Sequence, residues 1–442
     1  MLKGVDKLPL FSRNMVMNGG SCMEYRQRAV IVGCNINNDI GFLSMMEELS
    51  GLADACDIEV VGVITQKLER VYASHYIGKG KVKEVISLIH EKHSEMVIFN
   101  DELSPAQIRN LEKDLKCKVI DRTALILEIF AKRSKTKESQ LQVEIAKLQY
   151  ILPRLTDFQE SLEHQIDGGW LTNRDSRKTK FELDRRKIRS RISALNAELE
   201  TLFATRQNQR KQRKKAGIPV IALVGYTNAG KSSIMNTMID VYGSSIGKYV
   251  FEKDMLFATL ETYVRSIKLS DNRSFLLIDT VGFISKLPNQ LVKAFRSTLE
   301  EITDADMLIH VVDRSNPDYK QHIEVVKEIL GEMGAANIPT IYAYNKADLL
   351  RDEITKEEKD CIYVSAKYKT GIDNLINEIC KRAIEQQVCC QLLIPYEKGS
   401  ILSYFRDNAN IKSTEYKTNG VFISVECKEL DYRRYKQYES LI

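Results

Sequence analysis

Residues 225–232 have the types and spacing of a phosphate-binding loop. They fit the pattern GxxxxGK[ST], and an apolar run at residues 220–224 predicts the strand that must precede such a loop. Glycines let backbone N–H groups wrap phosphate oxygens, and the following helix presents its positive end to them. We expect Lys231 to reach the β- and γ-phosphates of a nucleotide and the Ser232 hydroxyl to bind Mg²⁺. The residues predicted to line the nucleotide here are Gly225, Tyr226, Thr227, Asn228, Ala229, Gly230, Lys231 and Ser232.

A second motif follows about fifty residues later, where an apolar run at residues 275–278 ends in Asp279, Thr280, Val281 and Gly282. An acid at this place holds Mg²⁺ through water, and the Gly282 N–H can sense the γ-phosphate. An apolar strand that ends in aspartate is common in proteins. Its distance from the phosphate loop makes it informative.

Two further motifs indicate the base. Asp348, in the run Asn345, Lys346, Ala347 and Asp348, can accept hydrogen bonds from both N1–H and the 2-amino group of guanine. Adenine lacks this donor pair, so a site built for guanine rejects it. In the run Ser365, Ala366 and Lys367, the Ala366 N–H is predicted to contact the base oxygen. Each motif is weak alone, but the four in this order predict GTP and argue against a small-molecule kinase.

A first switch segment is predicted at Phe257, Ala258, Thr259, Leu260 and Glu261. GTPases need a threonine there that binds Mg²⁺ and releases it after hydrolysis, and Thr259 is the best candidate. The alternatives are an ordinary loop threonine or the neighbouring Thr262. The predicted catalytic set is therefore Lys231, Gly282 and Thr259, and the predicted Mg²⁺ set is Ser232, Thr259 and, through water, Asp279.

The residue after Gly282 is Phe283, where many GTPases place a glutamine that orients the attacking water. Phenylalanine cannot form that hydrogen bond, so slow intrinsic turnover with help from another group or a partner is expected. The plainer interpretation is that Phe283 only packs. We hypothesise that Asn228 helps to hold K⁺ against the β- and γ-phosphates.

These motifs need a scaffold, and the sequence predicts a multidomain α/β protein. Apolar runs at residues 29–34, 58–65, 96–99 and 118–121 alternate with room for helices, which is typical of a largely parallel sheet. Leucines and isoleucines at helical spacing over residues 141–155 and 183–202 predict an antiparallel helical hairpin, although Pro153 should kink or interrupt the first helix. The expected divisions are an N-terminal tail (1–27), an N-terminal α/β domain (28–122), a basic hairpin (123–216), a P-loop GTPase domain with a mainly parallel sheet (217–388) and a small α+β unit (389–442).

Composition sets broad limits. A chain of 442 residues suits two to four domains, and its 43% hydrophobic and 28% charged content is ordinary for a soluble protein. Neither a membrane span nor a signal peptide is recognised. Nine cysteines without CxxC spacing favour reduced thiols, so we expect a cytoplasmic protein, and we expect a monomer.

Charge is concentrated in one block. Residues 174–215 hold fifteen Lys or Arg and five Asp or Glu, a surplus of ten in a chain whose net charge is +5. Such a block suits a nucleic acid, with phosphate contact favoured over base stacking because few aromatics interrupt it. The alternative is a solvated helix face. The predicted RNA contacts are Arg174, Arg177, Lys178, Lys180, Arg185 and Arg186.

Once these motifs are set beside their surroundings, the chain resembles the HflX family of ribosome-associated GTPases over roughly residues 28–370. The resemblance rests on residues 76–81 (YIGKGK), 100–107 (NDELSPAQ), 119–123 (VIDRT), 141–150 (LQVEIAKLQY), 225–232, 257–260, 279–284 and 291–301. It implies binding to the large ribosomal subunit and its RNA, and a role in splitting stalled ribosomes, notably under stress, or in subunit biogenesis. An alternative is a GTP-switched RNA-binding or anti-association factor in which hydrolysis only resets the cycle. Family members are also reported to bind ATP through the N-terminal domain, but no motif in residues 1–215 shows that site.

Two segments depart from the family pattern. The family has a glycine-rich hairpin tip, whereas Gly168, Gly169 and Trp170 open a tip here that lacks the RGPGE core and keeps only the final Asp184, Arg185 and Arg186. In the first switch, residues 261–265 read ETYVR where the family has DPTTR. The altered tip puts ribosome splitting in question more than ribosome binding.

Overall fold

The computed structural model describes residues 26–39, 41–164, 174–215, 218–242, 256–257, 262–269, 273–288, 296–350, 361–383 and 387–440. Contacts within the chain divide it into two compact units. The first contains residues 1–208, 253–261 and 284–297, and the second contains residues 209–252, 262–283 and 298–442. The predicted multidomain α/β class is confirmed. In the described residues, no helix is both long enough and apolar enough to cross a membrane.

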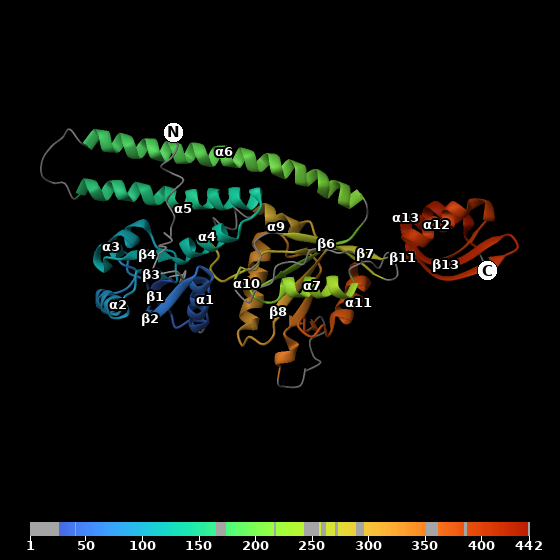
Figure 1. Cartoon of the computed structure of the whole chain (residues 1–442), viewed down its shortest axis with the longest axis horizontal. Helices are drawn as coiled ribbons and strands as arrows, with labels where there is room; N and C mark the ends of the chain where they lie inside the picture. The colour runs from blue at the N-terminus through green and yellow to red at the C-terminus, as the bar shows by residue number, and fades with distance from the viewer. Residues whose placement is uncertain are drawn as a thin grey trace, which may run out of the picture. The chain divides into compact units, whose positions relative to one another are not determined.

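The first unit begins with a four-stranded parallel sheet in the order β2-β1-β3-β4 (Figure 1). Its strands are β1 (Gln27–Ile36), β2 (Ile58–Leu68), β3 (Met96–Phe99) and β4 (Lys118–Asp121), and its helices are α1 (Phe42–Ala55), α2 (Lys79–Lys92), α3 (Pro105–Leu115) and α4 (Arg122–Arg133). Alternate residues of β1 are buried on opposite faces of the sheet. On one face, Val30, Val32 and Cys34 share a core with α2 and α3. On the other face, a Cβ on Gly33 would meet Met46 and Phe42 of α1.

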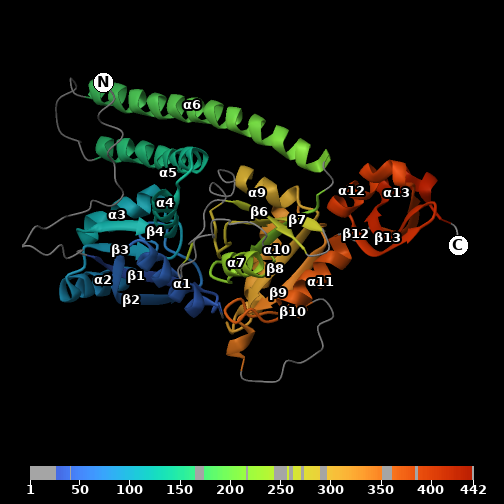
Figure 2. The same cartoon turned by 45° about the vertical axis from the view of Figure 1, so that its right-hand side comes forward.

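The hairpin is made of two long helices, α5 (Lys137–His164) and α6 (Arg174–Lys215), which lie side by side in both views (Figures 1 and 2). Its apolar seam joins residues from both helices, namely Leu141, Ile145, Leu148, Ile188, Leu195 and Leu199. Ion pairs from Lys137 to Glu198 and from Arg191 to Glu144 fit an antiparallel register. The interruption expected at Pro153 does not occur, since α5 continues through it. The predicted tip at residues 168–173 lies outside the described residues.

The second unit contains a six-stranded sheet in the order β10-β9-β8-β5-β7-β6, in which only β6 is antiparallel to its neighbour. Its strands are β5 (Val220–Gly225), β6 (Tyr263–Lys268), β7 (Ser274–Asp279), β8 (Met307–Asp313), β9 (Thr340–Asn345) and β10 (Cys361–Tyr363). Helices α7 (Lys231–Tyr242) and α11 (Ile372–Ala383) share one large core with the sheet, while α10 (Tyr319–Glu332) packs on Val312 and Tyr344. The short helix α9 (Arg296–Thr303) precedes β8, and the 3₁₀ turn η2 (Ala347–Leu349) follows β9.

The C-terminal residues of this unit form a separate antiparallel sheet in the order β11-β13-β12. Its strands are β11 (Gln387–Ile394), β12 (Asn410–Lys417) and β13 (Gly420–Lys428), and its helical elements are η3 (Tyr396–Lys398), α12 (Gly399–Asn408), α13 (Glu429–Tyr435) and η4 (Lys436–Tyr438). Alternate residues of β11 and β13, such as Leu392 and Ile423, form a core with Phe405 of α12. The predicted small α+β unit is thus present.

Candidate nucleotide site

The phosphate loop joins β5 to α7 at the carboxyl edge of the parallel strands. Gly225 has φ +151°, and a Cβ there would run into the Val311 carbonyl oxygen, so only glycine fits. Gly230 has φ +91°, and a Cβ would meet the Asn345 side-chain amide. Both glycines of the motif are therefore required by the backbone path, which brings the loop against two neighbouring strands.

Lys231 is the first residue of α7, and its ammonium group turns back onto the loop. Its Nζ donates hydrogen bonds to the Gly225 carbonyl at 3.1 Å and to the Tyr226 carbonyl at 2.8 Å. Burial lowers the pKa of Lys231 to about 8, while the charge of Asp279 acts in the opposite direction. The cation is thus held inside the loop where a phosphate would be bound.

Two predicted Mg²⁺ ligands are adjacent. The Ser232 hydroxyl donates to Asp279 Oδ2 at 2.6 Å, and Asp279, the last residue of β7, is fully buried. The Thr227 hydroxyl is also buried and has no hydrogen-bond partner among the described residues. Hydroxyl and carboxylate oxygens are the ligands that Mg²⁺ prefers, so these residues fit that ion.

Gly282 and Phe283 lie directly against the phosphate loop. A Cβ on Gly282 would stand 2.8 Å from Thr227 Cα and 3.0 Å from Lys231 Nζ. The Phe283 N–H donates to the Gly225 carbonyl at 3.1 Å, and the Thr227 N–H donates to the Phe283 carbonyl at 2.8 Å. The Phe283 side chain is 1% exposed, so the plainer expectation, that it packs, is what the structure shows.

The predicted base-binding residues gather at the ends of β9 and β10. Asn345 donates from its side chain to the Ala229 carbonyl at 2.9 Å and accepts from the Ala366 N–H at 3.1 Å, which joins three motifs through one side chain. Ser365 donates to Asp348 Oδ1 at 2.5 Å, so the carboxylate that would read guanine is oriented by its neighbour. The Ala347 N–H donates to the Val364 carbonyl at 3.2 Å.

Two residues that the sequence analysis did not single out support this arrangement. Asp313, at the end of β8, accepts from Lys346 Nζ at 2.7 Å, and Lys346 adopts the left-handed backbone conformation (φ 60°). The Thr237 hydroxyl of α7 donates to the Ala366 carbonyl at 3.1 Å. The apolar run at residues 307–312 that ends in Asp313 was a signal for the first of these, and nothing in the sequence pointed to the second.

The remaining predicted nucleotide residues fall into three groups. Thr280 is buried and donates to the Leu223 carbonyl at 2.6 Å, Val281 is buried beside it, and Lys367 Nζ lies 5.3 Å from the Tyr368 ring centre. Phe257 belongs to the first unit, where its ring packs edge-on against Phe130 at 4.7 Å. The other predicted residues of the first switch lie outside the described residues: Ala258, Thr259, Leu260 and Glu261.

The predicted RNA contacts all lie on α6. Arg186 is exposed and Arg185 is partly exposed. Four others are on the helix, but their side chains are outside the described set: Arg174, Arg177, Lys178 and Lys180. The structure therefore assembles the phosphate and base motifs into one site and places the basic residues on a different element.

Three family models match consecutive parts of the chain. They are described as "GTP-binding GTPase N-terminal" (residues 44–131), "GTP-binding GTPase Middle Region" (residues 133–213) and "50S ribosome-binding GTPase" (residues 220–346). The first match begins within α1 and so omits β1, the second covers most of the hairpin, and the third covers the nucleotide-binding sheet from β5 to β9 without β10.

Curated relatives match nearly the whole chain. A protein named "GTPase HflX" from Caldanaerobacter subterraneus subsp. tengcongensis is 42% identical over 92% of this chain and 93% of its own. A protein of the same name from Escherichia coli K12 is 35% identical over 94% and 97%. A solved GTP-binding protein from Sulfolobus solfataricus in complex with GDP is 24% identical and covers 81% of this chain and 99% of its own, with a TM-score of 0.43, too low to bear on the site.

Proposed function

Because the chain belongs to the HflX family of GTPases and is a GTP hydrolase, we propose that it associates with the large ribosomal subunit through helix α6. The observation that carries this proposal is the surplus of ten positive charges on residues 174–215, the span of a single 42-residue helix. A family model described as "50S ribosome-binding GTPase" matches the nucleotide domain of the same chain and supports it. Phosphate contacts by such a helix give affinity that is strong and dependent on salt.

The roles proposed at the site follow from its contacts. Lys231 and the loop N–H groups would hold the β- and γ-phosphates, and Asp348 and Ala366 would hold guanine. Ser232 and Asp279 would hold Mg²⁺, together with the predicted Thr259, and the ion would neutralise charge that develops on the phosphates. Gly282, pressed against Thr227 and near Lys231 Nζ, is the residue that a γ-phosphate would displace or engage.

Hydrolysis is proposed to be slow until a partner assists. Phe283 is buried and engaged through its backbone, so its side chain contributes no group that can orient water. Asn228 lies exposed in the phosphate loop with φ 60°, and it is proposed to help hold K⁺ there. Turnover measured in K⁺ and in Na⁺ with large subunits absent or present tests this, and equal rates in all four conditions would remove K⁺ from the proposal.

The action on ribosomes is proposed to be splitting of stalled particles or a step in subunit biogenesis. The buried Phe283 also favours a second candidate, a GTP-switched anti-association factor in which hydrolysis only resets the cycle. Co-sedimentation with subunits and whole ribosomes in GTP, GDP or a non-hydrolysable analogue separates the two. Full splitting with the analogue supports the second candidate, and no sedimentation with large subunits in any nucleotide contradicts the proposal as a whole.

Two pairs of charge-reversing substitutions test whether α6 is the surface that binds the large subunit. Arg185→Glu with Arg186→Glu reverses two charges on α6, and Lys113→Glu with Lys320→Glu makes the same change of net charge at exposed residues elsewhere. The first pair should weaken sedimentation with large subunits and reduce its dependence on salt, since each lost phosphate contact lowers the slope of log affinity against log salt by about 0.9. The second pair should leave both unchanged.

A further inference from the structure

Two consecutive residues at the junction of β4 and α4 hold different parts of the first unit. Asp121 ends β4 and Arg122 begins α4, and their exposed fractions are 0% and 2%. Buried charges of this kind are costly unless they are paired and hydrogen-bonded. Asp121 accepts hydrogen bonds at both carboxylate oxygens, and Arg122 pairs through its two terminal nitrogens while its buried Nε has no partner among the described residues. The two side chains bind different segments.

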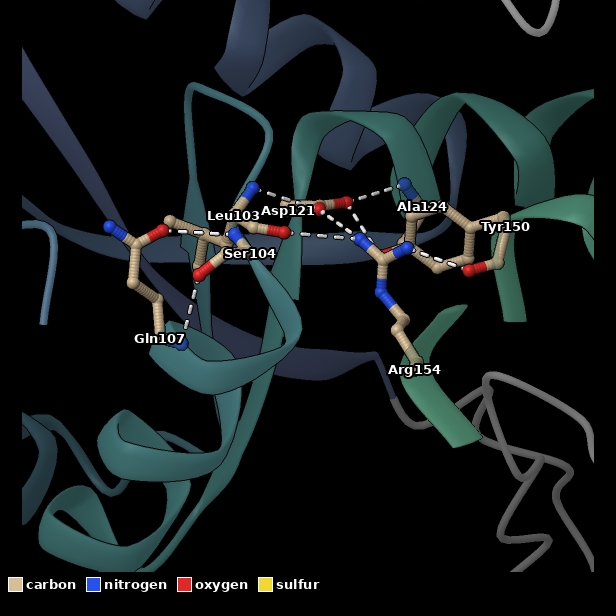
Figure 3. A network of polar contacts seen from close by, with 7 residues as sticks. All are labelled: Leu103, Ser104, Gln107, Asp121, Ala124, Tyr150 and Arg154. Carbon is tan, nitrogen blue, oxygen red and sulfur yellow. Dashed lines mark hydrogen bonds and ion pairs between the residues drawn. The ribbon is translucent and has the colours of Figure 1, made fainter. Parts of the chain in front are cut away.

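Asp121 holds the hairpin. Its Oδ1 accepts from the Tyr150 hydroxyl and the Ala124 N–H, each at 2.8 Å, and its Oδ2 accepts from Arg154 at 3.0 Å and the Leu103 N–H at 3.1 Å. Figure 3 shows the carboxylate between the loop at Leu103 and the two α5 side chains. Burial and the charge of Asp121 raise the pKa of Tyr150, so its hydroxyl keeps the donated proton.

Arg154 strengthens the same junction. It donates to the Tyr150 carbonyl at 2.7 Å and the Leu103 carbonyl at 3.2 Å, and its guanidinium lies 3.3 Å from the Tyr150 ring centre. Charge-assisted hydrogen bonds are about twice as strong as neutral ones. Helix α5 is therefore fixed to the end of β4 by a connected network around one carboxylate.

Arg122 holds the segment that follows Gly282. It donates to the Ser285 carbonyl at 3.1 Å and the Asn100 side chain at 3.0 Å, and it forms an ion pair with Glu48 at 3.0 Å. The next residue of that segment, Lys286, pairs with Asp101, which also accepts from the Tyr76 hydroxyl. Ser285 and Lys286 thus have partners on the loop after β3 and at the start of α4.

The segment that Arg122 holds is joined through the chain to residues of the nucleotide site. The segment at residues 284–297 belongs to the first unit, and Phe283 is the last residue before it in the second. Phe283 bridges Gly225 and Thr227 of the phosphate loop through its backbone. One residue, Ile284, therefore separates a segment fixed by the phosphate loop from one fixed by Arg122.

We propose that Asp121 and Arg122 are positioning residues that couple helix α5 of the hairpin to the segment after Gly282. This inference rests on the proposed function, because it gives the RNA-binding hairpin an influence on the GTPase residues. The two side chains share one close-packed backbone junction, so a shift of Ser285 on nucleotide exchange displaces Arg122 and with it Asp121 and α5. Coupling of this kind is reciprocal, so RNA that orders the hairpin also biases the segment after Gly282.

Two mild variants weaken the connection near its ends without removing buried charge. Lys286→Met removes the pair with Asp101 from a side chain that is 42% exposed, and Tyr150→Phe removes the hydroxyl on Asp121 and keeps the ring. Lys92→Met is a matched control, since Lys92 is also 42% exposed and pairs with Glu91. Folding of each variant is checked by its unfolding temperature.

The first measurement needs no ribosome. Hydrogen–deuterium exchange of α5 is compared in GDP and in a non-hydrolysable GTP analogue. The exchange should differ between the nucleotides in the wild type and in Lys92→Met, and the difference should be clearly smaller in Lys286→Met and Tyr150→Phe. No difference in the wild type, or an undiminished difference in both variants, overturns the inference.

The second measurement is the stimulation of GTP turnover by large subunits. The two variants should keep unstimulated turnover and lose about fivefold of the stimulation, the lower end of typical coupling between sites. The double variant should lose no more than the worse single one, because both break one connection. If the wild type itself does not bind large subunits, the proposed function fails, whereas the exchange experiment still decides the coupling.

Discussion

Lys231 shows how one side chain carries both the stability and the chemistry of the nucleotide site. Its ammonium is buried, bound to two loop carbonyls and close to Gly282. Burial disfavours the charged form, while a bound phosphate would favour it. Asp348 is the corresponding side chain at the predicted guanine site, where a hydrogen bond from Ser365 orients its carboxylate.

The pKa of Lys231, about 8, predicts how affinity depends on pH. GDP binding raises this pKa, because its phosphates favour the charged ammonium. Above pH 8 the complex therefore holds more protons than the free protein, and the affinity for GDP falls as the pH rises. We expect GDP affinity to drop about fourfold between about pH 7 and about pH 8.5. Fluorescent-nucleotide titrations measure it. In Lys231→Arg, whose guanidinium does not titrate here, the remaining affinity should stay constant, and an equal drop would refute the assignment.

Asp348→Asn should change base selectivity. An asparagine offers one donor and one acceptor in place of two acceptors, so guanine's N1–H and 2-amino donors are no longer both satisfied. We expect GTP affinity to fall by about two orders of magnitude and xanthosine triphosphate, with an oxygen in place of the 2-amino group, to bind better than GTP. Competition between the two nucleotides measures this. Asp373→Asn, a change of the same type at α11, should leave selectivity unchanged.

At the scale of elements, two kinds of contact hold the protein together. Apolar residues pack α5 against α6 in the hairpin, and short polar contacts join the loops at the carboxyl ends of the strands in the second unit. Asn345 joins the phosphate loop to the loop after β10, and Thr237 joins α7 to the same loop. Each link uses a backbone carbonyl or N–H that would otherwise be buried without a partner. The phosphate loop and the two base motifs can thus keep their relative positions before a nucleotide arrives.

Leu195→Ala should loosen the hairpin. Leu195 is 1% exposed in the seam between α5 and α6, and truncation of such a leucine costs about 2–5 kcal/mol of stability. Limited proteolysis of the hairpin should become faster, with nucleotide affinity unchanged. Leu183→Ala, at a site that is 47% exposed on the same helix, is the control and should behave as the wild type. Equal protease resistance of both variants would contradict the packing described.

At the scale of the whole molecule, the sequence predicts best where local pattern and chemistry coincide. The bounds of β3 and β4 were predicted to the residue, because both are short runs that are buried except at Lys118. Strands β6 and β8 were not identified. β8 is a buried apolar run, interrupted only by His310, that periodicity cannot distinguish from a buried helix, and β6 lacks the strict alternation of apolar and polar residues that would indicate a strand. Pro153 did not end α5, since contacts of Tyr150 and Arg154 with Asp121 hold the helix on both sides of it.

The candidate site shows the same division. The motif residues follow from spacing. The contacts of their supports do not, because Asp313 and Thr237 reach Lys346 and Ala366 only through the fold, although the run before Asp313 marks its place at a strand end. The Asp121 and Arg122 network is equally invisible in sequence, since its partners are up to 163 residues apart. Long-range contacts of single polar side chains leave no periodic trace.

His310 should make the second unit sensitive to acid. It is buried on β8, and burial, Lys327 and Lys231 lower its pKa to about 3. Below about pH 6.5 the imidazole of His310 is protonated in the unfolded chain but stays neutral in the folded chain. The free energy of unfolding therefore falls as the pH is lowered from 6.5 toward 3. The loss attributable to His310 at about pH 5 is about 2 kcal/mol. Urea unfolding at about pH 6.5 and at about pH 5 measures this loss. The free energy of unfolding should fall less between the two pH values in His310→Gln than in the wild type, and an equal fall in both proteins would disprove the account.

Two hydrogen bonds join Phe283 to the phosphate loop, and both are made by main-chain atoms. Hydrogen bonds of this kind do not depend on which side chain the residue carries, except that proline would remove the donor. Over evolutionary time, position 283 could therefore exchange one buried apolar side chain for another and keep both bonds. A substitution that keeps the buried volume and the N–H therefore leaves this link to the phosphate loop in place.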